Sequence, residues 1–390
     1  MRVVWLYGSP GVGKSTVAWQ LYEELTASGS RWGYVDIDQL GMCYPAGEDD
    51  ADRHRLKGNV LGALLPNYAA AGVQTLVVSG VLDPTLAGWT REELVGAEVT
   101  FCRLVVGERE LRRRLDQRGA GESWEAVRLV DQELDAAGPL GPTVVTDGLD
   151  PSQVAVGADL SAGLSAGLSA GLSADLGADL GADLPSAAST RVAPGRHRGT
   201  VEIGRRSTVP GTVLWLCGTT GVGKSTVGWH AFTALLHAGR TAAFLDLRQL
   251  SFVRGATDTC HRLTSANVAT AWECFGAAGA THLVLSGAVD TREDVQLYRD
   301  ALPATAMTVH RLRAGREDLT RRIRSRGRGE GVRLAGDDLI GRPDAVLDAV
   351  AAGAWRRQEL LDAADVADAV VDATGLDPRD LARRVLPGDR

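Results

Sequence analysis

Two glycine-rich stretches of this chain end in the same four residues. "GSPGVGKST" occupies positions 8–16, and "GTTGVGKST" occupies positions 218–226. Both match G-x-x-x-x-G-K-[ST], in which backbone N–H groups curl around phosphate oxygens, the lysine contacts the terminal phosphates and the serine hydroxyl ligates Mg²⁺. The residues expected to bind a nucleotide are Gly8, Gly11, Val12, Gly13, Lys14, Ser15 and Thr16, and then Gly218, Gly221, Val222, Gly223, Lys224, Ser225 and Thr226. The alternative is two glycine-rich turns without a ligand.

Lysine is rare in this chain, and two of its lysines stand in these two stretches. The 42 basic residues include only three lysines, Lys14, Lys57 and Lys224. A compact ammonium on a flexible stem fits inside a loop that wraps a phosphate, and a planar guanidinium does not replace it. The presence of lysine at the same step of both loops therefore favours phosphate binding.

Acidic residues follow the next apolar run. "YVDIDQL" (34–40) contains Asp36 and Asp38, two residues apart and thus on one face of an extended strand. At the carboxyl end of a parallel sheet, one carboxylate can help to hold Mg²⁺ through water, and the other can orient or deprotonate an acceptor hydroxyl. The alternative is a pair of solvated carboxylates at the end of a strand.

The second half of the chain differs at this point. "FLDLRQL" (244–250) has Asp246 at the position that matches Asp36, but Arg248 stands where the first half has Asp38. A guanidinium cannot act as a general base near neutral pH. Arg248 therefore either binds an anionic acceptor or marks a lost activity.

These motifs recur in the same order, which indicates an internal duplication. The expected strands are 2–7, 33–37, 75–79, 100–106 and 143–146, followed by 212–217, 241–247, 281–286, 306–312 and 368–372. Helical patterns such as 14–27, 108–118 and 345–365 alternate with them. This alternation predicts an α/β protein of two fused domains, each a mostly parallel five-stranded sheet with helices on both faces. We expect the domains at 1–155 and 211–390, joined by a low-complexity linker at 156–210 that is disordered or transiently helical.

With these elements in place, the chain resembles the P-loop kinases of the nucleotide, shikimate and gluconate kinase group, within the P-loop NTPase superfamily. The resemblance covers each half nearly end to end and rests on "GSPGVGKST", the "DID" and "VVSG" strand ends, the "LRRRLDQR" helix and "TDGLD". It implies domains that move the γ-phosphoryl group of ATP to a small acceptor. It also implies that Asp36 and Asp246 lie on the Mg²⁺ side, and that Asp38 is the catalytic carboxylate that binds the acceptor.

The resemblance also suggests roles for several arginines. Arg114 and Arg118, matched by Arg322 and Arg326, are four residues apart on one helical face, in a segment that resembles the lid of such kinases. Together with Lys14, guanidinium groups there would neutralise charge on the transferring phosphoryl group. The alternative is a solvated, charged helix face. Arg55 lies where the group commonly has its acceptor-side helices, and would suit an acidic or phosphorylated acceptor.

Composition limits the partners that we expect. The net charge of −7 gives no electrostatic reason to expect nucleic acid or an anionic membrane. No apolar run approaches the roughly 20 residues of a transmembrane helix, and the first loop begins before the core of a signal peptide could end. The five scattered cysteines are interpreted as reduced thiols, which favours the cytoplasm.

These features predict ATP- and Mg²⁺-dependent phosphoryl transfer to a small-molecule acceptor. We expect the N-terminal domain to be the active copy and the two domains to pack as a pseudo-dimer. The alternative is a nucleotide-binding regulatory module, or a slow ATPase, with a degenerate second domain. Stimulation of ATP turnover by an acceptor would discriminate between the two hypotheses.

Overall fold

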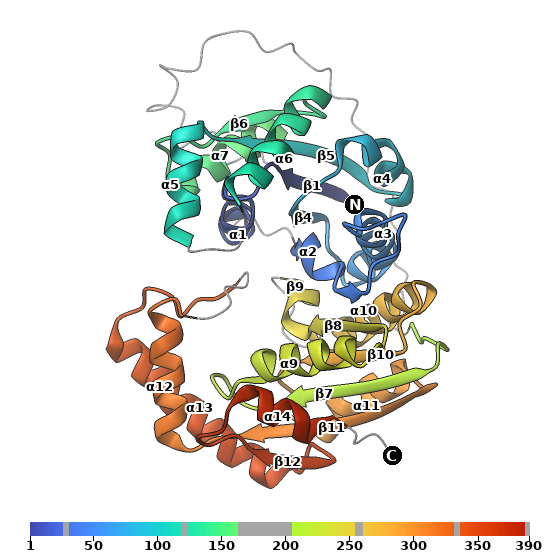
Figure 1. Ribbon diagram of the computed structural model, residues 1–390, viewed down its shortest axis with the longest axis vertical. Helices are drawn as coiled ribbons and strands as arrows, with labels where there is room; N and C mark the ends of the chain where they lie inside the picture. The colour runs from blue at the N-terminus through green and yellow to red at the C-terminus, as the bar shows by residue number, and fades with distance from the viewer. Residues whose placement is uncertain (26–30, 119–122, 163–204, 254–259, 331–335, 387–390) are drawn as a thin grey trace.

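Two α/β domains follow one another along the chain and pack against each other (Figure 1). The computed structural model describes residues 1–25, 31–118, 123–162, 205–253, 260–330 and 336–386. Most of the expected linker therefore lies outside the described residues. Each domain has a central, mostly parallel sheet with helices around it, so the predicted fold class is confirmed.

The N-terminal sheet has the strand order β6-β5-β1-β4-β2-β9. Its own five strands run parallel and lie close to the predicted ranges: β1 (Arg2–Tyr7), β2 (Trp32–Asp36), β4 (Thr75–Ser79), β5 (Glu98–Val105) and β6 (Thr143–Val145). The helices of this domain are α1 (Lys14–Leu25), α2 (Ile37–Leu40), α3 (His54–Ala70), α4 (Ala87–Glu93), α5 (Glu108–Arg118), α6 (Trp124–Ala137) and α7 (Pro151–Ala162). Helices α1 and α7 pack together on one face of the sheet, and α3 packs on the other.

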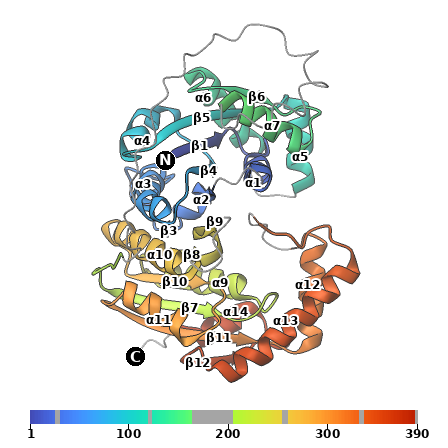
Figure 2. The same ribbon diagram turned by 180° about the vertical axis from the view of Figure 1, so that it is seen from behind.

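The C-terminal sheet has the order β12-β11-β7-β10-β8-β3, which matches the first sheet position by position. Its own parallel strands are β7 (Gly211–Cys217), β8 (Ala242–Asp246), β10 (His282–Ser286), β11 (Thr305–Arg313) and β12 (Ala369–Asp372). Its helices are α9 (Lys224–His237), α10 (Cys260–Ala277), α11 (Arg292–Ala301), α12 (Arg316–Gly327), α13 (Asp344–Ala364) and α14 (Pro378–Val385). Helices α12 and α13 pack against each other and project as an arm at one side of the domain (Figure 2).

Each sheet gains a sixth strand from the other domain. Strand β3 (Cys43–Tyr44) pairs antiparallel with β8, and β9 (Phe252–Val253) pairs antiparallel with β2. The five parallel strands of each domain were predicted, but the exchanged strand was not. A run of two residues is too short for an alternating pattern, and its pairing partner lies in the other domain.

The interface between the domains continues their apolar cores. Helices α3 and α10 pack against each other, and one cluster of buried side chains includes Tyr68 of α3 and Leu263 of α10. Asn67 Nδ2 donates to Asn267 Oδ1 and to Thr270 Oγ1, each at 3.0 Å. Buried amides need partners of this kind, so these bonds specify how the two helices lie against each other.

Helix α7 crosses the boundary that we expected at residue 155. Val154 and Ala155 are buried in the cluster under α1, Val156 is also buried, and the helix continues to Ala162. A helix that packs on α1 belongs to the N-terminal domain, so the described part of that domain extends about two turns beyond the expected boundary.

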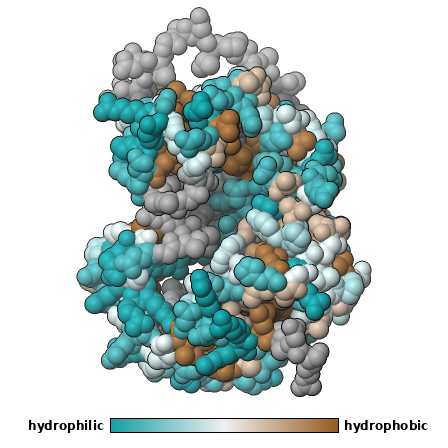
Figure 3. Space-filling view, in the orientation of Figure 1, coloured by the Kyte–Doolittle hydropathy of each residue, from teal (hydrophilic) through white to brown (hydrophobic). Residues whose placement is uncertain are grey.

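The surface is mixed in character. In the view of Figure 3 it is mainly hydrophilic over the α12–α13 arm, where Arg324 and Asp348 form an exposed ion pair at 2.7 Å. Within the described residues, no helix has both the length and the apolar character needed to cross a membrane. Of the described cysteines, Cys43, Cys102 and Cys217 are buried and Cys274 is half-buried, and none of these four forms a disulfide.

Candidate nucleotide-binding and phosphoryl-transfer site

The first glycine-rich loop joins β1 to α1, as its sequence predicts. Gly8, Gly11 and Gly13 have φ angles of 151°, 91° and 102°. A Cβ atom at Gly8 would lie 2.4 Å from the carbonyl oxygen of Leu104, which leaves space for glycine alone. The loop can therefore adopt the tight curl that directs successive N–H groups inward.

Lys14 lies inside this loop. Its Nζ donates to the carbonyl oxygens of Gly8 and Ser9, each at 3.0 Å, and the residue is buried. Val12 is buried in the core, whereas Thr16 is exposed in the first turn of α1. The ammonium is thus positioned by backbone oxygens at the centre of the curl.

Ser15 and Asp36 meet beside the loop. Ser15 Oγ donates to Asp36 Oδ2 at 3.2 Å, and the backbone N–H of Asp38 donates to Asp36 Oδ1 at 3.1 Å. Burial, and then the neighbouring carboxylate of Asp38, raise the pKa of Asp36 to about 6. Ser79, at the end of β4, donates to Ser15 Oγ at 3.4 Å, and Tyr34 OH lies 2.8 Å from Ser79 Oγ.

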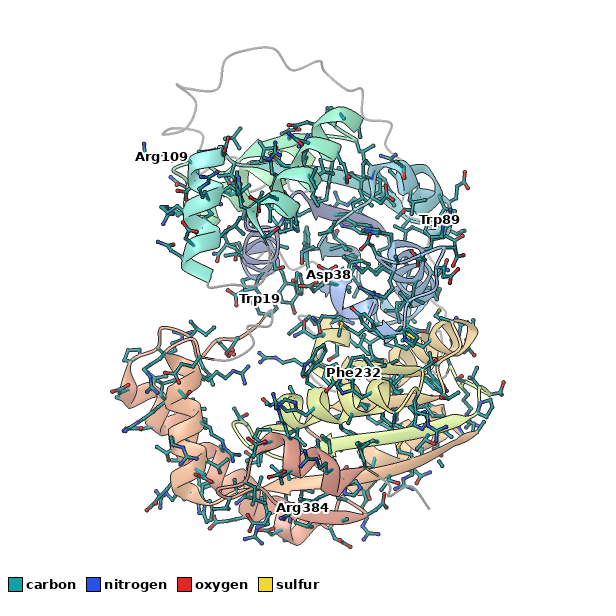
Figure 4. All side chains as sticks on the ribbon, in the orientation of Figure 1. Trp19, Asp38, Trp89, Arg109, Phe232 and Arg384 are labelled. Carbon is teal, nitrogen blue, oxygen red and sulfur yellow. The ribbon has the colours of Figure 1, made fainter. Side chains whose placement is uncertain are left out.

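Asp38 has a partner that the sequence analysis missed. Lys57 Nζ donates to Asp38 Oδ1 at 2.8 Å, and the carboxylate side chain is 46% exposed whereas the lysine is 10% exposed. The Arg55 guanidinium instead lies over the ring of Trp89, 5.5 Å from its centroid, and Figure 4 shows Trp89 at the outer edge of the domain. The rarity of lysine was the one signal in the sequence that could have directed attention to Lys57.

Arg114 contacts the loop itself. Its guanidinium donates to the carbonyl oxygen of Val12 at 3.0 Å and to the carbonyl oxygen and Oγ1 of Thr146 at 3.0 and 3.1 Å, and its Nε donates to Glu110. These bonds tie helix α5 and the end of β6 to the backbone of the loop. Arg118 is the last residue of α5, and its side chain lies outside the described residues.

The second loop repeats this arrangement. Gly218, Gly221 and Gly223 have φ angles of 133°, 78° and 103°. Lys224 Nζ donates to the carbonyl oxygen of Thr219 at 2.9 Å. Burial lowers the pKa of Lys224 to about 8, and the nearby Asp246 carboxylate opposes that change.

The serine and aspartate of the second loop also meet. Ser225 Oγ donates to Asp246 Oδ2 at 2.9 Å and lies 3.0 Å from Ser286 Oγ. Arg248 donates its backbone N–H to Asp246 Oδ1 at 3.1 Å, as Asp38 does in the first domain. Thr226, like Thr16, is exposed.

The arginines of α12 correspond only in part to those of α5. Arg322 donates to the carbonyl oxygen of buried Val222 at 2.8 Å, and so holds the second loop as Arg114 holds the first. Arg326 donates to Asp337 at 2.6 Å and lines a cavity of about 480 Å³ above the loop. Arg357 of α13 lines the same cavity, and no motif in the sequence pointed to it.

Residues 3–137 match a protein-family model described as an AAA domain. That range holds the strand, the glycine-rich loop and helix α1, the Asp36–Ser15 contact at the carboxyl end of the sheet, and the arginine helix that binds the loop. Both domains have the mostly parallel α/β sheet that the motifs predict.

The similar solved structures described here align with 42–45% of this chain. They include the Deinococcus radiodurans tunicamycin resistance protein, at 22% identity over 42% of this chain and 96% of that chain, with a TM-score of 0.34. A gluconokinase from Sinorhizobium meliloti aligns at 21% identity over 42% and 95%, with a TM-score of 0.32. An APS kinase from Mycobacterium tuberculosis aligns at 20% identity over 45% and 95%, with a TM-score of 0.28. A comparison with curated proteins found no match.

Proposed function

We propose that the N-terminal domain transfers the γ-phosphoryl group of ATP to a hydroxyl group of a small molecule, and that the C-terminal domain binds nucleotide without being the main catalyst. The observation that carries this proposal is the position of Asp38. Its Oδ1 is bonded to Lys57, and Oδ2 has no hydrogen-bond partner within the described part of the chain. One carboxylate oxygen is thus anchored and the other can accept a hydroxyl proton.

The chemistry of the loop supports ATP and Mg²⁺ as cofactors. Lys14 and the inward N–H groups suit the β- and γ-phosphates. The Ser15 hydroxyl and an Asp36 carboxylate oxygen, 3.2 Å apart, are hard oxygen donors of the kind that Mg²⁺ prefers, with water completing its shell. When bound, Mg²⁺ would neutralise charge on the phosphates. Asp246 and Ser225 offer the same pair of donors in the second domain.

In the proposed step, Asp38 Oδ2 accepts a hydrogen bond from the acceptor hydroxyl and orients its oxygen toward the γ-phosphorus. As the new O–P bond forms, the bond from the γ-phosphorus to the bridging oxygen of ADP breaks, and the hydroxyl proton passes to Asp38. Lys57 keeps the carboxylate in position. Arg114 positions the loop through the Val12 carbonyl, and Arg118 is proposed to contact the phosphoryl group.

The contacts between the domains support a pseudo-dimer within one chain. Strands β3 and β9 are exchanged reciprocally, and α3 packs on α10 across the interface. We propose that this pairing holds the two sites in a fixed relationship. We also propose the domain division expected from the sequence, 1–155 and 211–390, with the end of the first domain moved from residue 155 to the end of α7. The free cysteines support the cytoplasm as the proposed location.

ATP turnover tests this function. Turnover would be measured with a panel of hydroxyl-bearing small molecules and in water alone, for the unaltered protein, for Asp38→Asn and for Arg248→Ala as the matched change. We expect at least one acceptor to stimulate turnover, Asp38→Asn to abolish the stimulation and Arg248→Ala to retain it. Stimulation that survives Asp38→Asn would overturn the assignment of the acceptor carboxylate.

A regulatory module is the second candidate function, and the strand exchange favours it. In each domain the aspartate beside the loop precedes an exchanged strand by a few residues: Asp36 precedes β3, and Asp246 precedes β9. Nucleotide bound at one site could therefore change the other domain. A nucleotide-dependent change of shape, without stimulation by any acceptor, would support this candidate over the kinase.

A further inference from the structure

The acceptor sides of the two clefts differ in charge at two matched positions. In the first domain Asp38 and Lys57 form an ion pair at 2.8 Å, with no net charge. Arg248 follows Asp246 as Asp38 follows Asp36, and Thr264 ends "HRLT" (261–264) as Lys57 ends "HRLK" (54–57). The same two positions therefore carry one positive charge in the second domain.

Both of these residues line the cavity above the second loop. The cavity has a volume of about 480 Å³ and is bordered by Lys224 and Ser225 on the loop side. Arg248, Thr264 and Tyr298 border it away from the loop. A space of this size is within the range of small-molecule sites, which are roughly 300–1,000 Å³.

Arg248 is the least firmly paired of the three arginines that line this cavity. Arg326 contacts Asp337 at 2.6 Å, and Arg357 forms an ion pair with Asp290. The contact of Arg248 with Asp338 is 3.4 Å long, and the two side chains are 52% and 69% exposed. A long, exposed ion pair contributes little free energy, so an anion can replace Asp338 at small cost.

We propose that the C-terminal cleft binds a small molecule that carries a carboxylate or phosphate group, and that Arg248 contacts this group beside the nucleotide. The position of this ligand beside the nucleotide rests on the proposed nucleotide binding. Its negative charge does not depend on that proposal. The guanidinium offers parallel N–H donors that match a carboxylate or a phosphate. Because it stands where the first domain has its acceptor carboxylate, it makes this cleft a binding site for an anion and not a copy of the first.

Calorimetric titration of the full-length protein tests the inference. The protein would be saturated with Mg²⁺ and AMPPNP and then titrated separately with succinate and with glycerol 3-phosphate, which distinguish a carboxylate from a phosphate. We expect one of them to bind, and Arg248→Ala to weaken its binding by at least about fivefold, because a charge-assisted bond is lost. Arg248→Lys should restore part of the affinity, since lysine keeps the positive charge but lacks the parallel N–H donors of the guanidinium.

Arg379→Ala is the matched control, because Arg379 is an exposed residue of α14 that does not line the cavity. Equal weakening by Arg379→Ala and Arg248→Ala would overturn the inference, since only net charge would then matter. Absence of binding by both probes, with AMPPNP bound normally, would also overturn it and would leave the proposed function standing. If AMPPNP itself fails to bind, the proposed function fails. Titration of succinate and of glycerol 3-phosphate into the unliganded protein then still decides the role of Arg248 by the same comparison.

Discussion

Tyr34 of the N-terminal sheet lies against Phe252 of the C-terminal domain, with ring centroids 5.7 Å apart. The hydroxyl of the same tyrosine is 2.8 Å from Ser79 Oγ, which donates to Ser15 Oγ at 3.4 Å. An aromatic side chain of one domain is thus separated by two side chains from the serine that we propose to ligate Mg²⁺ in the other. Phe244, at the position that matches Tyr34, has no hydroxyl group.

The exchanged strand should contribute strongly to stability. Phe252 is 7% exposed and also packs on Trp19, at a ring-centroid distance of 4.9 Å. Phe252→Ala should lower the free energy of unfolding by about 3 kcal/mol, because the buried ring is lost and a cavity remains. Urea unfolding followed by tryptophan fluorescence would measure this. Val253→Ala, in the same strand, removes much less buried area, and an equal effect from it would contradict a specific role for the ring.

Replacement of Asp36 by a neutral residue should stabilise the ligand-free protein. Burial raises the pKa of Asp36 from 3.8 to about 6, so its charge at pH 7 disfavours the folded state. Asp36→Asn should therefore raise the free energy of unfolding at pH 7 by about 2 kcal/mol, at the expense of the proposed Mg²⁺ binding.

The pH dependence of this gain has a defined sign. The folded state binds the Asp36 proton more tightly than the unfolded state, so the unaltered protein gains stability as pH falls from 7 toward 4. The advantage of Asp36→Asn should shrink over the same interval. Urea unfolding without Mg²⁺ at pH 5, 6, 7 and 8 would measure it, and an advantage that grows toward pH 5 would refute the argument.

The two loop lysines should differ in their effect on turnover. Lys14→Ala should reduce phosphoryl transfer by about a hundredfold or more, since a cation that stabilises the transferring phosphoryl group is lost. Lys224→Ala, the matched change, should leave most of the activity. Steady-state rates with a stimulating acceptor would measure the loss of activity in each variant. Equal losses would mean that both domains catalyse phosphoryl transfer.

Nucleotide binding at the second loop should weaken in alkaline solution. Burial lowers the pKa of Lys224 to about 8, so its ammonium is deprotonated as pH rises through that value. With the first loop disabled by Lys14→Ala, affinity for Mg²⁺–AMPPNP should fall by up to about tenfold between pH 7 and pH 9. Calorimetry would measure this, and Lys14→Ala combined with Lys224→Ala is the control. A pH dependence that persists in the double variant must come from another group.

The sequence predicted the parts of the fold that depend on local patterns. The ten parallel strands follow apolar runs that each carry their own signal, and β4 (Thr75–Ser79) and α5 (Glu108–Arg118) have the expected bounds. The two glycine-rich loops were predicted equally well, because a tight curl around phosphate requires glycine at fixed positions followed by lysine and serine. Asp36 lies next to Ser15 because the carboxyl ends of neighbouring parallel strands lie at one edge of the sheet.

Contacts between distant segments were decided only by the tertiary structure. Nothing in the residues near 57 indicates that Lys57, and not Arg55, reaches Asp38, because that depends on how α3 is rotated against the sheet. The exchanged strands depend in the same way on the packing of α3 against α10. The sequence by itself determined two glycine-rich loops and the replacement of an aspartate by Arg248. The tertiary structure decided that Arg248 lines a cavity and that each domain completes the sheet of the other, since both relationships arise from long-range packing that no local pattern encodes.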